Sequence, residues 1–545
     1  VFTIAHLGND HRRTVAMGQC WPCCGSQQSA GPVYTALRQV VEETTHRGAL
    51  DLSVLRLNFN PSRKFQHFYR VGRLLGDGSF GAVHECFCRT TNEARAVKLL
   101  LKSRIKDGGA AIANEIEILT KLDHPHVVRF YEFFEDSRSV LCVVELCEHG
   151  DLSSVLDKPS GQDSVRVLYR DVMLGLAYLH SFGIAHRDLK FTNCVLAWNG
   201  LRDIAKIIDF GLGAIRREED VEEEWMSEVL GTLAFVAPEV VQKSYSEKCD
   251  CWSFGIMVFM QLTQGQHPYG GSWRGRSNLP NRQLLMRLQD PPRLELLCTA
   301  DARGSELVAR LLAHEPQQRL SAQEALQMAW LRPKSIRRVE RSCNLSHREQ
   351  SLMRRSLSSY KDLTSFDKAV LLMATQFQKR EVLRKSSDIF VSTDTDKSGY
   401  LSENEIKGAL QAVGLSTAQG LVEDTWRSLD TSEDGKVSHS EWLSATMQPA
   451  DLETSVKDLF TWLDYDGDGK VSLEEVERFV TAEEASEVLK SAGKDGVMNF
   501  QDFTRLITDI ANRRYGQIAA SPSSLSESGL VSPEGGSSPE SVRQK

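Results

Sequence analysis

The sequence predicts a multidomain protein in which a two-lobed α+β domain is followed by an all-α domain. The 545-residue chain is too long for a single hydrophobic core and suits about two to four domains. Between residues 68 and 332, strand-like stretches come first and mostly helical ones follow. Between residues 386 and 512, a unit of helix, acidic twelve-residue loop and helix repeats along the chain.

Composition narrows the class of protein. A hydrophobic content of 41% and a charged content of 25% are ordinary for a globular protein. The formal net charge of -8 argues against a nucleic-acid partner, which calls for a basic excess. The 12 cysteines show no zinc-site spacing, so we expect reduced thiols and a cytoplasmic location. No apolar run approaches the ~20 residues that span a bilayer.

The elements of the α+β domain follow one another from a loose extension at residues 1–67. Strand-like patterns occupy Tyr69–Leu75, Ala94–Leu99 and Val140–Glu145. Helical patterns follow at Asp163–His180 and Lys248–Thr263. This order predicts one strand-rich lobe and one helical lobe.

A glycine-rich segment, Gly76–Val83, predicts a loop over phosphates, because glycines let backbone N–H groups approach phosphate oxygens closely. A dinucleotide-binding turn has the same glycine spacing but opens a helix. Here a second strand follows instead and ends at Lys98, which suits the α- and β-phosphates. A carboxylate must hold this lysine, and Glu115 is the candidate. Glu117 competes with it, but two residues rotate a helix by about 200°, so both cannot face Lys98.

Two further motifs complete a phosphoryl-transfer constellation. The segment His186–Asn193 supplies Asp188 to accept a hydroxyl proton and Asn193 as a magnesium ligand. Asp209, in Asp-Phe-Gly, supplies the second magnesium ligand. Ala237-Pro238-Glu239 closes the intervening segment. Phosphoryl transfer needs mainly positioned charge, and these residues provide it in chain order.

Residues 68–332 resemble a eukaryotic protein kinase domain of the calmodulin-kinase-like group, and Arg319 matches the family's partner for Glu239. The resemblance implies Val144 as gatekeeper and Asp151 facing the ribose or the substrate. The ATP site that it implies comprises Leu75, Gly76, Asp77, Gly78, Ser79, Phe80, Gly81, Val83, Ala96, Lys98, Val144, Glu145, Cys147, Asp151 and Asp209. The implied catalytic residues are Asp188, Lys190, Asn193, Lys98 and Glu115, and the magnesium ligands are Asn193 and Asp209.

Two departures from that family bear on specificity and control. Phe191-Thr192 replaces the usual Pro-Glu, which puts a preference for arginine before the target in doubt. Arg187 normally takes an anionic partner from the activation segment. This segment holds either a solvated charge run or a carboxylate that replaces an activating phosphate, the acids being Glu218, Glu219, Asp220, Glu222, Glu223 and Glu224.

Three loops fit the EF-hand calcium template, with oxygen ligands at fixed positions, a glycine at the sharp turn and a closing glutamate. The ligands predicted for the first loop are Asp394, Asp396, Ser398, Tyr400 and Glu405. Those of the second are Asp430, Ser432, Asp434, Lys436 and Glu441. Those of the third are Asp464, Asp466, Asp468, Lys470 and Glu475. In each loop the residue at position seven (Tyr400, Lys436 or Lys470) contributes its backbone carbonyl.

A fourth unit has lost ligands: its matching positions hold Ser491, Gly493, Asp495, Gly496, Asn499 and Asp502. Position three offers no side-chain oxygen. We expect a structural role, with Val471 of the third loop pairing with Met498, and weak metal binding is the other interpretation.

The order of parts resembles the calcium-dependent protein kinases of plants and protists. The resemblance implies that residues 333–385, an amphipathic junction, and the calcium-free module 386–512 hold the kinase inactive. Leu357, Tyr360, Leu363, Phe366, Val370 and Leu371 recur at helical spacing in this junction. The segment Met353-Arg354-Arg355-Ser356-Leu357-Ser358 resembles a basophilic kinase target and suits a pseudosubstrate or an autophosphorylation site. The alternative function is a calcium-sensing pseudokinase scaffold, which predicts a missing catalytic residue.

The predicted enzyme is therefore a calcium-regulated serine/threonine kinase that uses ATP, Mg²⁺ and Ca²⁺, acts on protein substrates and is monomeric. Gly18 follows Met17, so myristoylation there and palmitoylation at Cys20, Cys23 and Cys24 would anchor the chain to a membrane. If Met17 is not the initiator, Gly18 is internal and cannot be acylated. Residues 513–545 are rich in Ser, Pro and Gly and are expected to be disordered.

Overall fold

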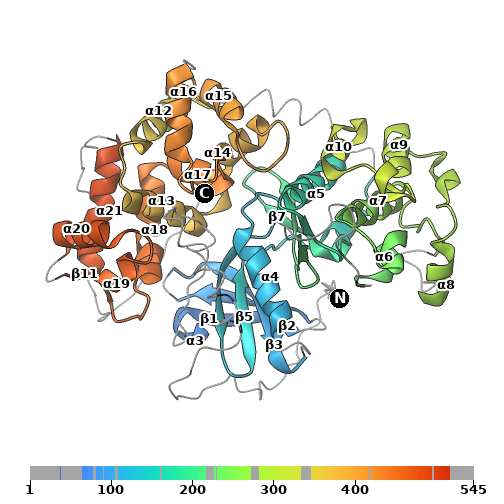
Figure 1. Ribbon diagram of the computed structural model, residues 1–545, viewed down its shortest axis with the longest axis horizontal. Helices are drawn as coiled ribbons and strands as arrows, with labels where there is room; N and C mark the ends of the chain where they lie inside the picture. The colour runs from blue at the N-terminus through green and yellow to red at the C-terminus, as the bar shows by residue number, and fades with distance from the viewer. Residues whose placement is uncertain are drawn as a thin grey trace, which may run out of the picture.

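The computed structural model describes residues 64–515, together with Val33 and Leu37, except for residues 78–80, 90, 105–108, 160–162, 217–225, 227, 229, 272–280, 333–344, 416–418 and 494–495. The described part is built as a two-lobed kinase-like domain with a helical module against it (Figure 1). No helix of this described part is long and apolar enough to cross a bilayer.

The first lobe is a five-stranded antiparallel sheet in the order β1-β2-β3-β5-β4 with one long helix. Strand register sets Val83 of β2 opposite Lys98 of β3, and Ala96 opposite Val144 of β5. The predicted nucleotide-site residues therefore lie on adjacent strands. The elements are α3 (Phe65–Phe68), β1 (Tyr69–Asp77), β2 (Gly81–Cys88), β3 (Ala94–Leu101), η1 (Lys102–Arg104), α4 (Ala110–Lys121), β4 (Phe130–Glu135) and β5 (Ser139–Val144).

The second lobe packs its helices around α5 and α7, both of which are almost wholly buried. This lobe also contains two short antiparallel strand pairs, β6 with β9 and β7 with β8. The elements are η2 (Leu152–Val155), α5 (Asp163–Ser181), β6 (Ile184–Ala185), η3 (Phe191–Asn193), β7 (Cys194–Trp198), β8 (Asp203–Ile207), β9 (Ala214–Ile215), η4 (Leu233–Phe235), α6 (Pro238–Gln242), α7 (Lys248–Leu262), α8 (Asn281–Arg287), η5 (Leu294–Leu297), α9 (Ala302–Leu311), η6 (Pro316–Gln318), α10 (Ala322–Gln327) and η7 (Ala329–Leu331).

The C-terminal module has its own hydrophobic core, and its helices flank the loops predicted to bind calcium. The first two loops are joined by a bridge between Leu401 and Val437, and β10 pairs with β11 between the third and fourth. The elements are α14 (Arg380–Thr393), α15 (Glu403–Ala412), α16 (Gln419–Leu429), α17 (His439–Thr446), α18 (Pro449–Leu463), β10 (Lys470–Val471), α19 (Leu473–Val476), α20 (Ala482–Ala492), β11 (Met498–Asn499) and α21 (Phe500–Tyr515). The expected module ends, 386 and 512, thus fall inside α14 and α21.

The junction forms two helices, α12 (His347–Tyr360) and α13 (Ser365–Phe377), where its periodicity suggested one. The break has a local cause. Thr364 accepts a hydrogen bond from the Asp367 backbone N–H and the Asp367 carboxylate reaches back to Thr364 N, so a new helix starts there. Both helices share the core of the C-terminal module: the buried faces of α12 and α13 include Met353, Leu357, Tyr360, Phe366, Val370 and Leu371. Figure 1 shows α12 and α13 among the orange and red helices, on one side of the two lobes.

Candidate functional site

The lysine of β3 is held by two carboxylates from different elements. Lys98 Nζ lies 2.5 Å from Glu115 Oε1 on α4 and 2.7 Å from Asp209 Oδ1. The competing Glu117 instead pairs with Lys121 one helical turn away, at 2.7 Å. The structure therefore brings Lys98, Glu115 and Asp209 together and leaves Glu117 on another face of α4.

Burial sets the ionisation of this cluster. Burial alone would lower the pKa of Lys98, but Asp209 and Glu115 more than offset it and raise the pKa above its usual value. Burial raises the pKa of Glu115, although Lys98 opposes the effect. Burial also raises the pKa of Asp209, but the charge and hydrogen bond of Lys98 have the larger effect, so the pKa of Asp209 is lowered. The Lys98 ammonium thus stays charged beside the ionised carboxylate of Asp209.

In the predicted catalytic loop, the carboxylate of Asp188 is fixed by several hydrogen bonds. Asp188 Oδ2 accepts from Lys190 Nζ at 2.5 Å and from Asn193 Nδ2 at 3.2 Å. Its Oδ1 accepts from the Thr232 backbone N–H at 2.8 Å and from the Thr232 hydroxyl at 2.7 Å. Asn193 Oδ1 is buried without a hydrogen-bond partner. A buried oxygen without a hydrogen bond costs free energy, and coordination of Mg²⁺ by this amide oxygen would remove that cost.

A buried aspartate on α7 holds the start of the predicted catalytic loop through hydrogen bonds to its backbone. Asp250 accepts the backbone N–H groups of His186, at 2.8 Å, and Arg187, at 2.9 Å. Arg187 has a φ of 64°, an unusual left-handed conformation that these bonds stabilise. Burial alone would lower the pKa of His180, but its hydrogen bond to Asp250 raises the pKa to about 10. The charged imidazole thus compensates the buried carboxylate.

Between the lobes lies a cavity of about 440 Å³ that collects most of the predicted nucleotide residues. Those that line it are Leu75, Gly76, Val83, Ala96, Lys98, Glu115, Val144, Glu145, Cys147 and Asp209. Gly78, Ser79 and Phe80 lie outside the described residues. Asp77 and Gly81 flank them on β1 and β2, and the Asp151 carboxylate accepts from the Ser153 N–H at 2.9 Å at the start of η2.

Sequence reasoning missed several apolar walls of this cavity, among them Cys142, Val195 and Ile208. They belong to no motif. Val195 lies on β7 and Ile208 directly after β8. In the sequence they could be found only because they are close to Asn193 and Asp209, the predicted magnesium ligands. Thr192 also lines the cavity, and its buried hydroxyl has no hydrogen-bond partner.

The activation segment supplies an anion to Arg187 from a position that the sequence analysis did not name. Arg187 Nη1 lies 3.8 Å from Glu228 Oε2, while its Nε donates to the Leu212 carbonyl at 2.5 Å. The six acids proposed for this role, at 218–220 and 222–224, lie outside the described residues. At the end of the segment, Arg319 Nη2 donates to Glu239 Oε2 at 3.0 Å in a fully buried pair, as the sequence predicts.

Each of the three predicted calcium loops has the same hydrogen-bond frame. At position six, Gly399, Gly435 and Gly469 donate their backbone N–H to the first aspartate of their loops, in each case at 3.0 Å. Their φ angles of 80°, 81° and 85° are ones that glycine adopts readily. The closing glutamates Glu405, Glu441 and Glu475 accept from the backbone N–H at position nine.

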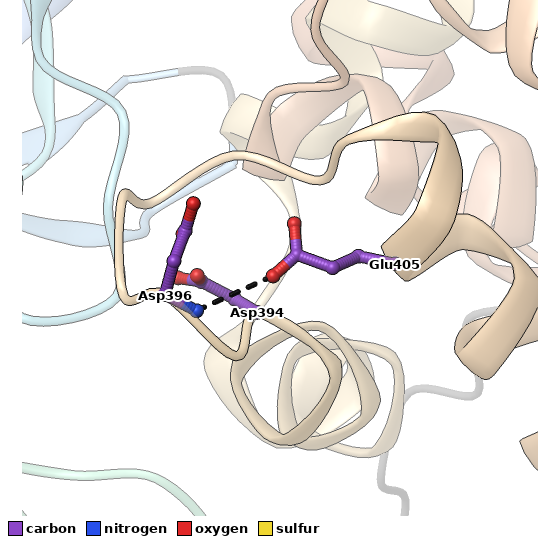
Figure 2. A group of neighbouring side chains, drawn as sticks. All are labelled: Asp394, Asp396 and Glu405. Carbon is purple, nitrogen blue, oxygen red and sulfur yellow. Dashed lines mark hydrogen bonds between the residues drawn. The ribbon is translucent and has the colours of Figure 1, made fainter.

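Carboxylates converge in the first and third of these loops. Asp394, Asp396 and Glu405 place ligand oxygens within 4.8 Å of one another, as do Asp464, Asp466 and Asp468. Figure 2 shows the first group, with the Glu405 carboxylate directed at the aspartates from the start of α15. Burial raises the pKa of Asp394 to about 7 and that of Asp464 to about 6.

These features fit calcium. Asp464 Oδ1 is buried and has no hydrogen-bond partner among the described residues, and the nearby carboxylates of Glu475 and Asp468 add to the raised pKa of Asp464. A hard divalent cation with oxygen ligands relieves both costs. The second loop has Ser432 in place of one carboxylate and keeps the same backbone frame.

In the fourth unit, the loop's own backbone fills the space where a side chain at position three would begin. The Val497 carbonyl lies 2.4 Å from where a Cβ on Gly493 would stand, so the ligand positions three and seven lie against each other. Asp495 is outside the described residues. Val471 and Met498 pair in the β10–β11 ladder, which confirms the predicted link to the third loop.

Comparisons with known proteins agree with this geometry. Residues 69–331 match the protein kinase domain family, and residues 456–480 match the EF hand family. Calcium-dependent protein kinase 27 of Arabidopsis thaliana is 28% identical over 394 residues, which is 71% of this chain and 78% of the relative. Calcium-dependent protein kinase 4 of Plasmodium falciparum (isolate 3D7) is 26% identical over 511 residues, which is 87% of this chain and 92% of the relative. The chain is thus similar to calcium-dependent protein kinases in both of its domains and in their order.

This kinase is a serine/threonine protein kinase with ATP- and calcium-binding domains. The pseudokinase alternative is not supported, because Lys98, Asp188, Asn193 and Asp209 are all present. Lys98 and Asp209 line the cavity, and Asn193 donates a hydrogen bond to Asp188. Gly18, Cys20, Cys23 and Cys24, the candidates for lipid attachment, lie outside the described residues.

Proposed function

We propose that this kinase transfers the γ-phosphate of ATP to serine or threonine hydroxyls of proteins when calcium occupies its EF-hand loops. Asp188 accepts the hydroxyl proton, and Lys190 beside it offsets charge on the transferred group. Lys98, fixed by Glu115, holds the α- and β-phosphates. Asn193 and Asp209 hold Mg²⁺, which neutralises charge on the phosphate oxygens.

The observation that supports calcium control most directly is the location of the junction. Met353, Leu357 and Tyr360 of α12 are at most 2% exposed inside the C-terminal module. Every described residue that lines the nucleotide cavity belongs to the kinase domain. With the module holding α12, the active site is therefore clear of the junction.

Within the basic segment Met353–Ser358, Ser356 is sequestered in the same way, whereas Arg355 and Ser358 are exposed. Ser356 is 0% exposed, and its hydroxyl donates to the Leu352 carbonyl at 3.0 Å and the Met447 carbonyl at 3.3 Å. It can meet the active site as a pseudosubstrate only after α12 has left the module. We infer that calcium loading, which exposes an apolar groove in EF-hand proteins, provides the site that captures α12.

One experiment tests the catalytic and the regulatory parts separately. A peptide library is phosphorylated by the intact chain in calcium or in a chelator, alongside Asp209→Ala and Glu475→Gln. We expect Asp209→Ala to abolish transfer in both conditions. Glu475→Gln should retain transfer but require more calcium. Equal activity of the intact chain with calcium and with chelator would refute the regulatory proposal.

A truncated chain ending at Arg332 tests how control is exerted. Release of inhibition predicts that this truncation is active without calcium. A truncation that folds, binds ATP and stays inactive would show that the C-terminal module contributes positively to activity.

A further inference from the structure

The residue at position seven of the first calcium loop differs from its counterparts. The second and third loops have Lys436 and Lys470 there, and the first has Tyr400. An EF-hand loop uses only the backbone carbonyl at this position, so calcium binding does not dictate the side chain. The aromatic ring of Tyr400 therefore calls for another explanation.

The ring of Tyr400 lies on the kinase domain. Its centroid is 5.2 Å from that of Phe182 and 6.0 Å from that of Tyr178, both at the C-terminal end of α5. The Ser181 hydroxyl donates to the carbonyl of Ser398, the position-five residue, at 3.1 Å. A Cβ on Gly399 would stand 2.0 Å from the Tyr178 ring, so the loop backbone itself is in contact with α5.

Among the described residues, the position-six turns of the other two loops lie open, and the second loop meets the kinase only near its end, at Ser440. A Cβ built on Gly435 or Gly469, the same position in the second and third loops, would meet no described atom within 4 Å. Lys470 is exposed. Tyrosine thus occurs in the loop that meets the kinase, and lysine in the loops whose turns are open.

Two polar contacts extend this interface, and each suits the end of a helix. Asp123 accepts the backbone N–H of Ser440 at 2.6 Å, in the first turn of α17, where negative charge is favoured. Arg129 donates to the Thr375 carbonyl at 3.1 Å, near the C-terminus of α13, where positive charge is favoured. These contacts and Tyr400 form one continuous surface between the module and the kinase.

We propose that the first calcium loop is a docking element as well as a sensor: Tyr400 gives its carbonyl to calcium and its ring to Tyr178 and Phe182. This inference rests on the proposed calcium control. One conformation of the first loop then both binds calcium and docks on the kinase. Calcium binding and docking therefore stabilise each other. The kinase domain consequently raises the calcium affinity of the first loop.

The test uses the full chain with Tyr400→Lys, which gives the first loop the residue of the other two. Calcium binding is measured by calorimetry, and backbone hydrogen exchange is measured across residues 176–184 and 394–405. An aromatic pair of this kind predicts a loss of about 2- to 12-fold in the affinity of one calcium site. In the Tyr400→Lys chain, backbone exchange at the end of α5 should be faster than in the wild-type chain when calcium is present.

Phe182→Ala separates docking from local charge, because it leaves the calcium loop untouched. It should weaken the same calcium site, and the double variant with Tyr400→Lys should be no weaker than the stronger single variant. Additive losses, or normal calcium affinity in Phe182→Ala, would overturn the inference. The proposed function fails separately, when the wild-type chain binds calcium without any change in kinase activity.

Discussion

Truncation of one buried junction residue, Leu357→Ala, tests whether capture of α12 sets the calcium requirement. Leu357 is 2% exposed in the core of the C-terminal module. Leucine-to-alanine changes at such sites cost about 2–5 kcal/mol. A loss of about 3 kcal/mol disfavours capture of α12 about 100-fold. If three calcium ions bind together to drive capture, the capture equilibrium depends on the third power of the calcium concentration. An increase of about fivefold in calcium, the cube root of 100, should therefore restore half-activation.

The assay is peptide phosphorylation in buffers of fixed free calcium, with the intact chain and Leu357→Ala compared at the same protein concentration. Ser351→Ala is the matched control, because Ser351 lies on the same helix α12, is exposed and is outside the basic segment Met353–Ser358. It should leave the half-activating calcium concentration unchanged. A Leu357→Ala chain that folds and is half-activated at the wild-type or a lower calcium concentration would refute the reasoning.

Three further predictions concern buried charge. Burial lowers the pKa of His126 from 6.5 to about 4, so the neutral form is favoured in the fold. The free energy of unfolding is therefore unaffected by the titration of His126 above pH 6.5 and falls as the pH drops towards 4, by about 2 kcal/mol at pH 5. In urea unfolding, His126→Asn should reduce the loss of stability between pH 7 and pH 5. Glu228→Gln removes the exposed carboxylate near Arg187, and since exposed pairs contribute about 0–1 kcal/mol, kcat should fall less than about fivefold; a complete loss would contradict this. Arg319→Ala leaves Glu239 buried without its partner and should cost about 3–5 kcal/mol in the free energy of unfolding; a loss below about 1 kcal/mol would argue against the buried pair.

The sequence predicts the parts whose chemistry is local. An EF-hand loop closes through contacts within twelve residues, and the Gly399 and Glu405 hydrogen bonds are both internal to their loop. The kinase motifs are likewise read from short segments, and the fold brings Lys98, Glu115 and Asp209 together. These placements follow from spacing because each spacing corresponds to a single strand, turn or helix face.

What the sequence does not predict depends on partners far along the chain. Periodicity from Leu357 to Leu371 continues across the break at Thr364, because both helices turn an apolar face to one core. Glu228 reaches Arg187 from the activation segment, where several acids were equally eligible. The position of Tyr400 against α5 needs the arrangement of two domains, and no local pattern encodes it.

The end of α5 is the point at which the calcium module meets the catalytic machinery. Phe182 contacts Tyr400, and the chain then turns at Gly183, with a φ of 64°, into β6. The catalytic loop follows at once, and Asp250 holds its first backbone N–H groups. Only a short, hydrogen-bonded segment therefore separates Phe182 from Asp188. A module that fixes the end of α5 also restrains the entry to the catalytic loop, so calcium can act on the rate of transfer as well as on access to the active site.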